Sequence, residues 1–318
     1  LDMTSKLIKN IEASVRQRLL NKARQTGRSF ESVLQYYAIE RFIYRLSRSK
    51  HAGSFILKGA LMFSAWKAEI SRPTRDIDVL GRIDNQVANL VKIAKEICRQ
   101  PGEPDGVVFN ENAVTGEQII EEAEYLGVRI KMSGLLGNIR LYVQLDIGFG
   151  DVVHPAPRKI AYPTLIGSPE PHLLGYSMES VIAEKFESMV KKGILNSRFK
   201  DYYDVLIMAR QFDFKGNVLA EAIRRTFAQR RTPLTSEFGE GFSDGFQIGP
   251  IAGLKLFVKE EGKSDQWRDF LKKNKLDGAP EDLWEVVKAI TEFLEPVTTA
   301  LAGRKSFNKK WKAPGPWK

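Results

Sequence analysis

The 318-residue sequence has a single cysteine, Cys98, and only three histidines. One cysteine excludes a disulfide within the chain and is typical of a reducing compartment, so we expect the protein to act in the cytoplasm. So few sulfur and nitrogen ligands argue against a zinc site, and any metal ion would be bound by oxygen atoms. The sequence also lacks a run of about 18 apolar residues that could span a membrane, so we expect no membrane partner.

Positive charge is in excess, with 49 lysines and arginines against 39 acidic residues and a net charge of +10. This excess favours a polyanionic partner such as nucleic acid, although a solvated basic surface is the plain alternative. Hydrophobic residues make up 43% of the chain, as in an ordinary globular protein. The length allows one large domain or two medium ones.

Changes of pattern along the chain predict three parts. Residues 1–50 show apolar residues at helical spacing and form a predicted helical leader, in which Gly27 ends the first helix and Ser29 caps the second. Residues 51–165 alternate strands with helices and form a predicted α/β core, and residues 166–318 form a helical C-terminal lobe. The predicted fold class is therefore α+β, with a mixed sheet flanked by helices.

The expected elements follow from these patterns and from turn residues. Strands are expected at 55–57, 76–83, 107–114, 125–132 and 139–147, and helices at 60–69, 86–99, 177–192, 200–211, 215–229 and 280–301. The Pro-rich residues 148–171 predict a connection between lobes, and the Gly-rich residues 237–250 predict a loop.

The triplet Asp76-Ile77-Asp78 is the strongest local signal. Residues two apart in a strand face the same side, and two carboxylates placed so repel each other unless a cation lies between them. Carboxylate oxygen suits Mg²⁺, although such a triplet also occurs by chance in turns and acidic surfaces. Asp146 lies on the polar face of the alternating strand at 139–147 and supplies a third carboxylate if that strand lies beside the first. Such a set typically binds two metal ions for phosphoryl or nucleotidyl transfer.

Two further features fit a nucleotide site. Lys58-Gly59 links a strand to a helix, and Gly59 and Ala60 can present backbone N–H groups to a phosphate, although an ordinary turn is the commoner reason for a glycine there. Lys185 falls within the apolar stripe of its helix, where it must snorkel, pair with an acid or reach a ligand. Asp201 and Asp204 share a helical face; Asp201 suits the helix N-terminus, which leaves Asp204 as the candidate functional group.

Two basic regions are candidate RNA contacts. Residues 304–318 contain six lysines or arginines and no acid, interleaved with Trp311 and Trp317. These rings either stack on RNA bases or pack onto the second lobe. The second region is a cluster of four arginines: Arg224, Arg225, Arg230 and Arg231.

Four blocks together carry a resemblance to a known family. They are Phe55 to Ala60 continued by Arg72 to Asp78, Leu145 to Ile147, Val181 to Lys185, and Lys200 to Asp204. In this order they resemble the nucleotidyltransferase superfamily. More narrowly, the chain resembles the AbiEii/AbiGii abortive-infection toxins, the toxin half of type IV toxin–antitoxin pairs.

The resemblance implies a nucleotidyltransferase-like fold and Mg²⁺ bound by Asp76 and Asp78, with Asp146 as third carboxylate and candidate base. It assigns Lys185 and the region of Asp204 to catalysis or nucleotide binding. It also implies an NTP substrate, an RNA acceptor such as the tRNA 3′ end, inhibited translation, and an antitoxin from a neighbouring gene. Ala60 departs from the Gly or Ser of many relatives, which removes a hydroxyl contact to phosphate but keeps the backbone N–H.

Two other functions stay open on the sequence alone. One is nucleotidylation of a protein or small-molecule hydroxyl. The other is a non-catalytic module that binds RNA or a partner, against which the three intact aspartates argue.

Overall fold

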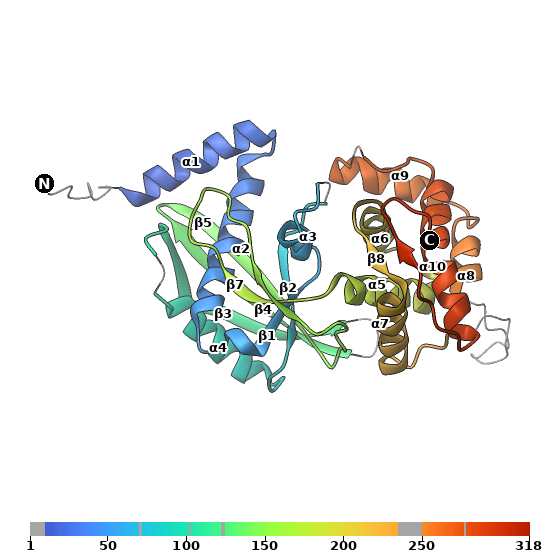
Figure 1. Ribbon diagram of the computed structural model, residues 1–318. Coiled ribbons are helices and arrows are strands. Elements are labelled where there is room, and N and C mark those ends of the chain that lie inside the picture. Colours follow the sequence, from blue (N-terminus) through green and yellow to red (C-terminus); the bar gives the residue numbers. More distant parts are fainter. Residues whose placement is uncertain (1–9, 70–71, 102, 122–124, 235–249, 277) are drawn as a thin grey trace, which may run out of the picture. The chain divides into compact units, whose positions relative to one another are not determined.

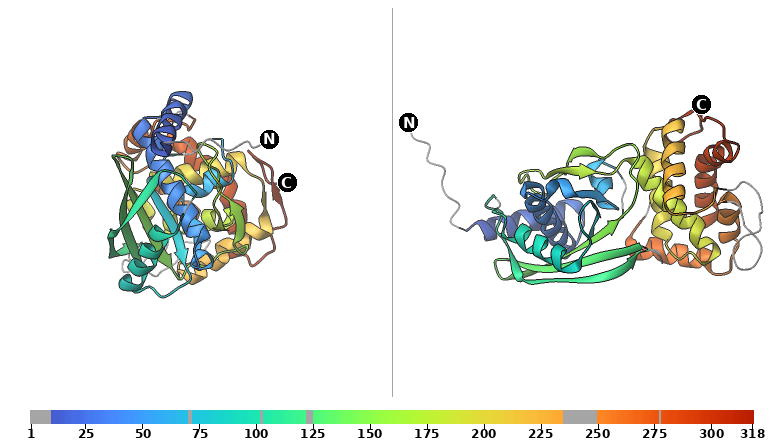
Figure 2. Two further views of the ribbon diagram at one scale, coloured as in Figure 1. Left: turned by 90° about the vertical axis from the view of Figure 1, so that its left-hand side faces the viewer. Right: turned by 90° about the horizontal axis from the view of Figure 1, so that it is seen from below.

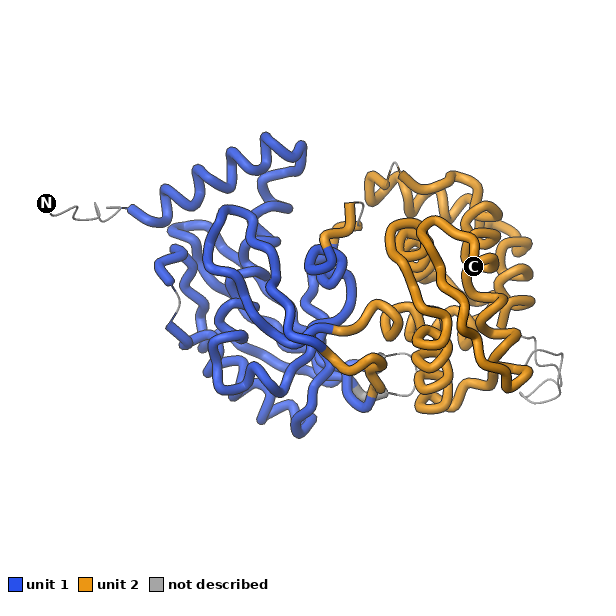
Figure 3. Tube along the Cα trace, viewed as in Figure 1, with its two compact units in different colours: residues 1–66, 74–150, 158–175 blue, residues 67–73, 151–157, 176–318 orange. Residues whose placement is uncertain are grey.

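The structure is a computed structural model that describes residues 10–69, 72–101, 103–121, 125–234, 250–276 and 278–318. The chain forms two compact units (Figure 3). Unit 1 comprises residues 1–66, 74–150 and 158–175, and unit 2 comprises residues 67–73, 151–157 and 176–318. The helices predicted as a leader lie within unit 1, and the three-part division of the chain stays a prediction.

Unit 1 is built on a seven-stranded mixed sheet with the strand order β3-β4-β5-β2-β1-β7-β6 (Figure 1). Its strands are β1 (Phe55–Lys58), β2 (Asp76–Gly81), β3 (Val107–Glu121), β4 (Tyr125–Leu136), β5 (Ile139–Phe149), β6 (Arg158–Ala161) and β7 (His172–Gly175). β2 runs parallel to β5 and β1 runs parallel to β7, whereas the other pairs are antiparallel. This mixed sheet with its helices confirms the predicted fold class.

The helices of unit 1 cover the apolar side of this sheet. They are α1 (Ile11–Thr26), α2 (Phe30–Arg48), the 3₁₀ helix η1 (Ala52–Ser54), α3 (Leu61–Ala65) and α4 (Val87–Arg99). Figure 2 shows α2 and α4 on one side of the long strands β3 and β4. Ile77 and Val79 of β2 are fully buried there in the same core as Tyr37 and Phe42 of α2. The opposite side of β2 and β5 therefore carries the polar residues of the alternation.

The helix boundaries follow the predicted capping residues. Gly27 ends α1 with φ 66°, in the left-handed region that favours glycine. The Ser29 side chain accepts a hydrogen bond from the Ser32 backbone N–H and caps α2, as predicted. The helix expected at 60–69 is shorter, because α3 ends at Ala65 and Lys67 adopts a positive φ of 57°.

The strand β6 corrects the prediction for residues 148–171, and β7 follows directly after them. The two strands pair with each other, and β7 also pairs with β1, so β6 extends the sheet in a part of the chain that was expected to form a connection. Each strand has only four residues, and prolines lie outside them, where no ladder N–H is needed. Strands this short show no readable period in the sequence.

Unit 2 is mainly helical, as predicted. Its elements are α5 (Met178–Lys192), the 3₁₀ helix η2 (Gly193–Leu195), α6 (Phe199–Gln211), β8 (Phe214–Lys215), α7 (Gly216–Gln229), α8 (Pro250–Phe257), α9 (Lys263–Asn274), α10 (Leu283–Ala302) and β9 (Lys310–Trp311). The sequence did not predict α8 and α9. The loop predicted at 237–250 lies outside the described residues except for Pro250, where α8 begins. Among the helices that the structure describes, none is both long and apolar enough to cross a membrane.

Candidate active site

The three aspartates singled out in the sequence lie on two neighbouring strands of unit 1. β2 and β5 pair in parallel, with Asp78 opposite Asp146 and Asp76 opposite Gln144. The predicted position of Asp146 depended on its strand lying beside β2, and the pairing confirms that condition. Residues opposite each other on adjacent strands project to the same side of a sheet, so the three carboxylates share one face.

Gly59 follows the last residue of β1 and lies against Asp78. Lys58 is the cross-strand partner of Asp78, and Gly59 follows with φ 70°. A Cβ atom added at Gly59 would overlap the Asp78 carboxylate. Glycine is therefore required here both for its backbone conformation and for the close approach of Asp78. Ala60 is buried and precedes α3, a helix of five residues. The nucleotide-binding role of Lys58, Gly59 and Ala60 stays a prediction.

Arg129 of β4 is the residue of this site that the sequence analysis missed. Its Nε and Nη2 atoms donate to Asp146 Oδ1 and Oδ2, each at 2.8 Å. Gln144 Nε2 also donates to Asp146 Oδ2, at 3.1 Å. The hydrogen bonds to Asp146 raise the pKa of the Arg129 guanidinium above its usual value, despite partial burial. Its position between the buried Val128 and Ile130 was the available signal, since the alternation places it on the polar side.

The charges of the site form an ordered row across four strands. Cross-strand pairing gives the order Lys58, Asp78, Asp146, Arg129 on β1, β2, β5 and β4. Two cations thus flank two adjacent carboxylates. Because like charges opposite each other destabilise a sheet, the flanking cations offset part of that repulsion.

The donor set fits a hard divalent cation in its chemistry and its strand register. In the described part of the chain, however, no group of three or more His, Cys, Asp or Glu side chains is arranged to hold a metal ion. Asp146 uses both of its oxygens for Arg129 and Gln144. A carboxylate has about four lone-pair sites, so these three hydrogen bonds leave Asp146 one further acceptor site.

The predicted residues Lys185 and Asp204 lie in a second charged cluster, in unit 2. Lys185 Nζ contacts Asp201 Oδ1 at 2.8 Å and Asp204 Oδ2 at 2.7 Å. Arg72 binds both oxygens of Asp204 at 3.0 Å, and Arg198 contacts Asp201 at 2.9 Å. Lys185 was expected to snorkel, pair with an acid or reach a ligand, and in the structure it pairs with two acids. The catalytic role of Lys185 and Asp204 stays a prediction.

Burial and charge act in opposite directions within this cluster. Burial raises the pKa of Asp201, but Lys185 and Arg198 outweigh it and hold that pKa at about 2. Burial lowers the pKa of Lys185, but Asp201 and Asp204 raise it above its ordinary value. The cluster is therefore a set of mutually stabilised charges that joins α5 to α6.

The four-arginine cluster does not form one exposed basic patch. Arg230 is buried and contacts Asp151 at 2.9 Å and Glu187 at 2.8 Å, so its assignment to such a patch was wrong. Arg224 and Arg225 are exposed, but both contact Glu221.

The C-terminal tryptophans pack within unit 2. Trp311 Nε1 donates to the Ala209 carbonyl at 2.7 Å, and Trp317 Nε1 donates to the Phe293 carbonyl at 2.8 Å. Both side chains are buried. Of the two alternatives for the tail, its tryptophans therefore follow the second: they pack within unit 2.

A mixed sheet with three carboxylates on one face is compatible with a nucleotide-processing enzyme, and the comparison with protein families identifies the family. A sequence model of the AbiEii nucleotidyl transferase toxin of type IV toxin–antitoxin systems matches residues 41–291. The chain therefore belongs to the AbiEii nucleotidyltransferase toxin family, as the sequence motifs predicted. Membership implies nucleotidyltransferase activity, a nucleotide substrate and a cognate antitoxin; members of the family generally use a divalent metal ion.

Two solved structures from Helicobacter pylori are similar to this chain. One is a protein provisionally assigned as a nucleotidyltransferase, and the other is JHP933. Each is 13% identical to this chain with a TM-score of 0.45, and the alignments cover 87% of this chain and 99% and 98% of the H. pylori chains. A comparison with curated proteins finds no match.

Proposed function

We propose that this enzyme transfers a nucleoside monophosphate from an NTP to the 3′-hydroxyl of an RNA, in a reaction that depends on Mg²⁺. The acceptor is the 3′ end of tRNA, and its modification blocks translation in the cytoplasm. The observation that carries the proposal is the direct pairing of Asp78 with Asp146 on parallel strands, with Gly59 packed against Asp78.

Asp76, Asp78 and Asp146 are the residues proposed to hold Mg²⁺. Bound there, Mg²⁺ would lower the pKa of the attacking hydroxyl and neutralise charge on the triphosphate. Asp146 can contribute through the acceptor site that Arg129 and Gln144 leave open.

The remaining roles belong to side chains and backbone of this chain. The RNA 3′-oxygen forms a bond to the α-phosphorus while the bond to pyrophosphate breaks, and Asp146 assists removal of the hydroxyl proton, either directly at its open acceptor site or through the metal ion that it would hold. Lys58 and the backbone N–H groups of Gly59 and Ala60 bind the phosphates. Lys185 and Asp204 are proposed to contribute to nucleotide binding and catalysis on the strength of the family resemblance.

An RNA acceptor is supported by charge. The net charge of +10 suits a polyanion, and the six cationic side chains of residues 304–318 are all exposed. The choice of tRNA rests on the family resemblance.

The test is a transfer assay with each of the four labelled NTPs, Mg²⁺ and either total RNA or purified tRNA. We expect label on tRNA with the wild type, and a loss of at least about 100-fold with Asp78→Asn, because metal ions supply several kcal/mol of transition-state stabilisation. Asp84→Asn is the matched control, since Asp84 is exposed just after β2. Chelation of the metal should abolish transfer, and added Mg²⁺ should restore it.

The other outcomes separate the alternatives. Label found only in protein or small molecules would replace RNA with another acceptor. RNA binding without label on any acceptor, unchanged by Asp78→Asn, would identify a binding module.

A further inference from the structure

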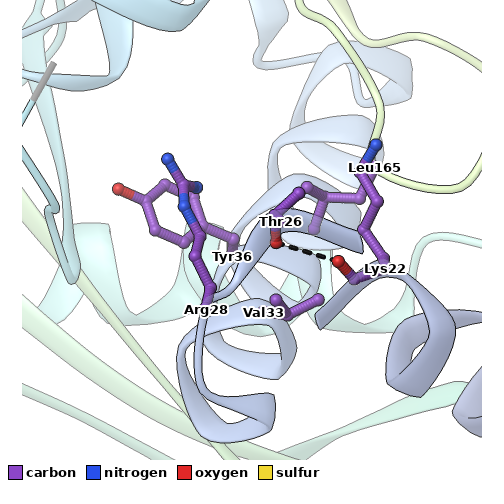
Figure 4. Close-up of a pocket in the computed structure, with 6 residues that line it drawn as sticks. All are labelled: Lys22, Thr26, Arg28, Val33, Tyr36 and Leu165. Atoms are coloured by element: carbon purple, nitrogen blue, oxygen red, sulfur yellow. Dashed lines mark hydrogen bonds between the residues drawn. The ribbon is translucent and has the colours of Figure 1, made fainter. Parts of the chain in front are cut away.

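A cavity of about 400 Å³ lies in unit 1, beside the segment that leads into β2. Six residues line it: Lys22, Thr26, Arg28, Val33, Tyr36 and Leu165 (Figure 4). They come from α1, α2, the turn between these helices, and the connection between β6 and β7. The volume falls within the range of about 300–1,000 Å³ that is usual for small-molecule sites.

The lining combines positive charge with an aromatic ring. Lys22 and Arg28 are cationic, and none of the lining residues is acidic. Neither cation forms an ion pair with the residues that the structure describes. The Arg28 guanidinium lies over the Tyr36 ring, 5.6 Å from its centroid. Planar guanidinium and tyrosine groups stack on nucleobases, whereas lysine contacts phosphate as a point charge.

Hydrogen bonds connect α2, which lines the cavity, to the residues just before β2, the strand that carries Asp76 and Asp78. The Thr74 backbone N–H donates to the Tyr36 hydroxyl at 2.9 Å, and Gln35 Nε2 donates to the Arg75 carbonyl at 3.2 Å. Thr74 precedes Asp76 by two residues, a span of about 6.7 Å in an extended chain. The carboxylates lie on the side of the sheet opposite α1 and α2, so a polynucleotide that reacts at Asp76 and Asp78 reaches the cavity by passing around the start of β2, where Thr74 and Arg75 lie.

We infer that this cavity binds a nucleotide of the RNA acceptor, next to the end that reacts. The inference rests on the proposed function and adds the residues that hold the acceptor. An acceptor nucleotide presents one base and one backbone phosphate, which match the stacked Arg28–Tyr36 pair and Lys22. The NTP fits less well, because its triphosphate is proposed to bind at Gly59, which would leave both cations of the cavity opposite a neutral base and ribose.

The experiment measures binding of two probes to the full chain: a fluorescent single-stranded RNA ending in CCA, and a fluorescent non-hydrolysable NTP. The test variant is the double substitution Lys22→Gln with Arg28→Gln. The control is Arg16→Gln with Arg24→Gln, which removes the same charge from exposed positions of α1 outside the cavity. Thermal unfolding checks that both variants fold.

We expect the test variant to bind RNA at least about 10-fold more weakly and to lower the slope of log K against log salt by about 0.7, for the one phosphate contact that Lys22 makes with a single strand. Its affinity for the NTP analogue should stay within about 2-fold of the wild type, as should both affinities of the control variant. Tyr36→Phe separates the ring from the hydroxyl that holds Thr74: it should keep RNA affinity, whereas Tyr36→Leu should lose about 5-fold or more.

Two results would overturn the inference: a loss of NTP affinity with unchanged RNA affinity, or equal RNA losses in the test and control variants. Both can be distinguished from failure of the proposed function. If the wild type labels RNA and the test variant labels it equally well at low RNA concentration, the cavity assignment fails while the function stands. If the wild type binds RNA through the cavity but labels only another acceptor, the function fails while the site stands.

Discussion

At the residue scale, Arg129 decides how Asp146 is presented. A bidentate arginine fixes the plane of a carboxylate, because two parallel N–H···O bonds allow little rotation. Gln144 adds a third hydrogen bond, so Asp146 is held more firmly than a carboxylate with a single partner. If Asp146 holds a metal ion as proposed, these bonds keep its orientation whether or not substrate is bound, and Arg129 then acts as a positioning residue.

Replacement of Arg129 should affect the use of the metal more than folding. We expect Arg129→Gln to lower kcat by about 10- to 100-fold and to raise the Mg²⁺ concentration needed for half-maximal rate, as is usual when a partner of a metal ligand is lost. Arg129→Lys keeps the positive charge but not the bidentate geometry, so its kcat and Mg²⁺ requirement should lie between those of the wild type and Arg129→Gln. A Mg²⁺ titration of transfer activity measures both effects.

The control for this prediction is Arg140→Gln, because Arg140 is an exposed arginine on the same side of β5. An Arg129→Gln enzyme with a wild-type Mg²⁺ titration would show that Asp146 works without this orientation.

At the element scale, the sequence predicts those features that are periodic or that depend on one turn residue. The alternation at 139–147 predicts β5 and the side on which Asp146 lies, and Gly27 and Ser29 mark real helix ends. The contact of Arg129 with Asp146 joins residues 17 apart through the register of β4 and β5, which no local pattern encodes. The four-residue strands β6 and β7 are too short to show a period.

The turn between β1 and α3 gives a prediction at this scale. Gly59→Ala introduces a Cβ at φ 70° and against the Asp78 carboxylate, so we expect a loss of about 1–3 kcal/mol in the free energy of unfolding. Transfer activity should fall even where the variant is fully folded, because Asp78 must move to make room for the added Cβ. Urea unfolding and the transfer assay measure the two effects. Gly53→Ala is the control, since a Cβ there meets nothing within 4 Å; equal effects of the two substitutions would contradict the packing argument.

The joint between α5 and α6 gives a prediction about pH. The pKa of Asp201 is about 2 in the folded protein, below the value of about 3.9 expected in the unfolded chain. The ionised carboxylate thus stabilises the fold above about pH 4, and this contribution is lost as the pH falls from 4 to 2. Asp201→Asn should be less stable at pH 7 by about 1–3 kcal/mol, because Lys185 and Arg198 lose a charged partner.

The same substitution should flatten the dependence of stability on pH between 4 and 2, which urea unfolding at several pH values measures. Asp269→Asn, at an exposed position of α9 in the same unit, should follow the wild-type curve. Parallel curves for Asp201→Asn and the wild type would mean that the cluster does not lower the pKa of Asp201.

At the scale of the whole molecule, the excess of positive charge is not uniformly available to a partner. Arg230 is neutralised inside unit 2 by Asp151 and Glu187, and Lys185 by Asp201 and Asp204. The C-terminal residues 304–318 combine both kinds of position, since their tryptophans are buried whereas their lysines are exposed. The tail is therefore a packed part of unit 2 that presents charge on its outer side.

This division of roles predicts opposite results for rings and charges in the tail. Trp317 stacks on Phe293, with ring centroids 5.7 Å apart, and makes an edge contact with Phe307 at 5.0 Å. Trp317→Ala should therefore lower the free energy of unfolding by about 3–5 kcal/mol. Trp284→Ala, at a 44% exposed position of α10, should cost no more than about 0.5 kcal/mol. Urea unfolding followed by circular dichroism compares them.

RNA binding distinguishes packing from base stacking in the tail. Under conditions where Trp317→Ala is still folded, its affinity for the fluorescent RNA should equal that of the wild type, because the exposed cations remain. Lys309→Gln with Lys310→Gln, which removes two exposed charges and no buried ring, should leave stability nearly unchanged. If these lysines contact RNA, the slope of log K against log salt should fall by about 1.4. A folded Trp317→Ala protein that loses RNA affinity without losing stability would mean that the ring leaves its buried position to stack on a base.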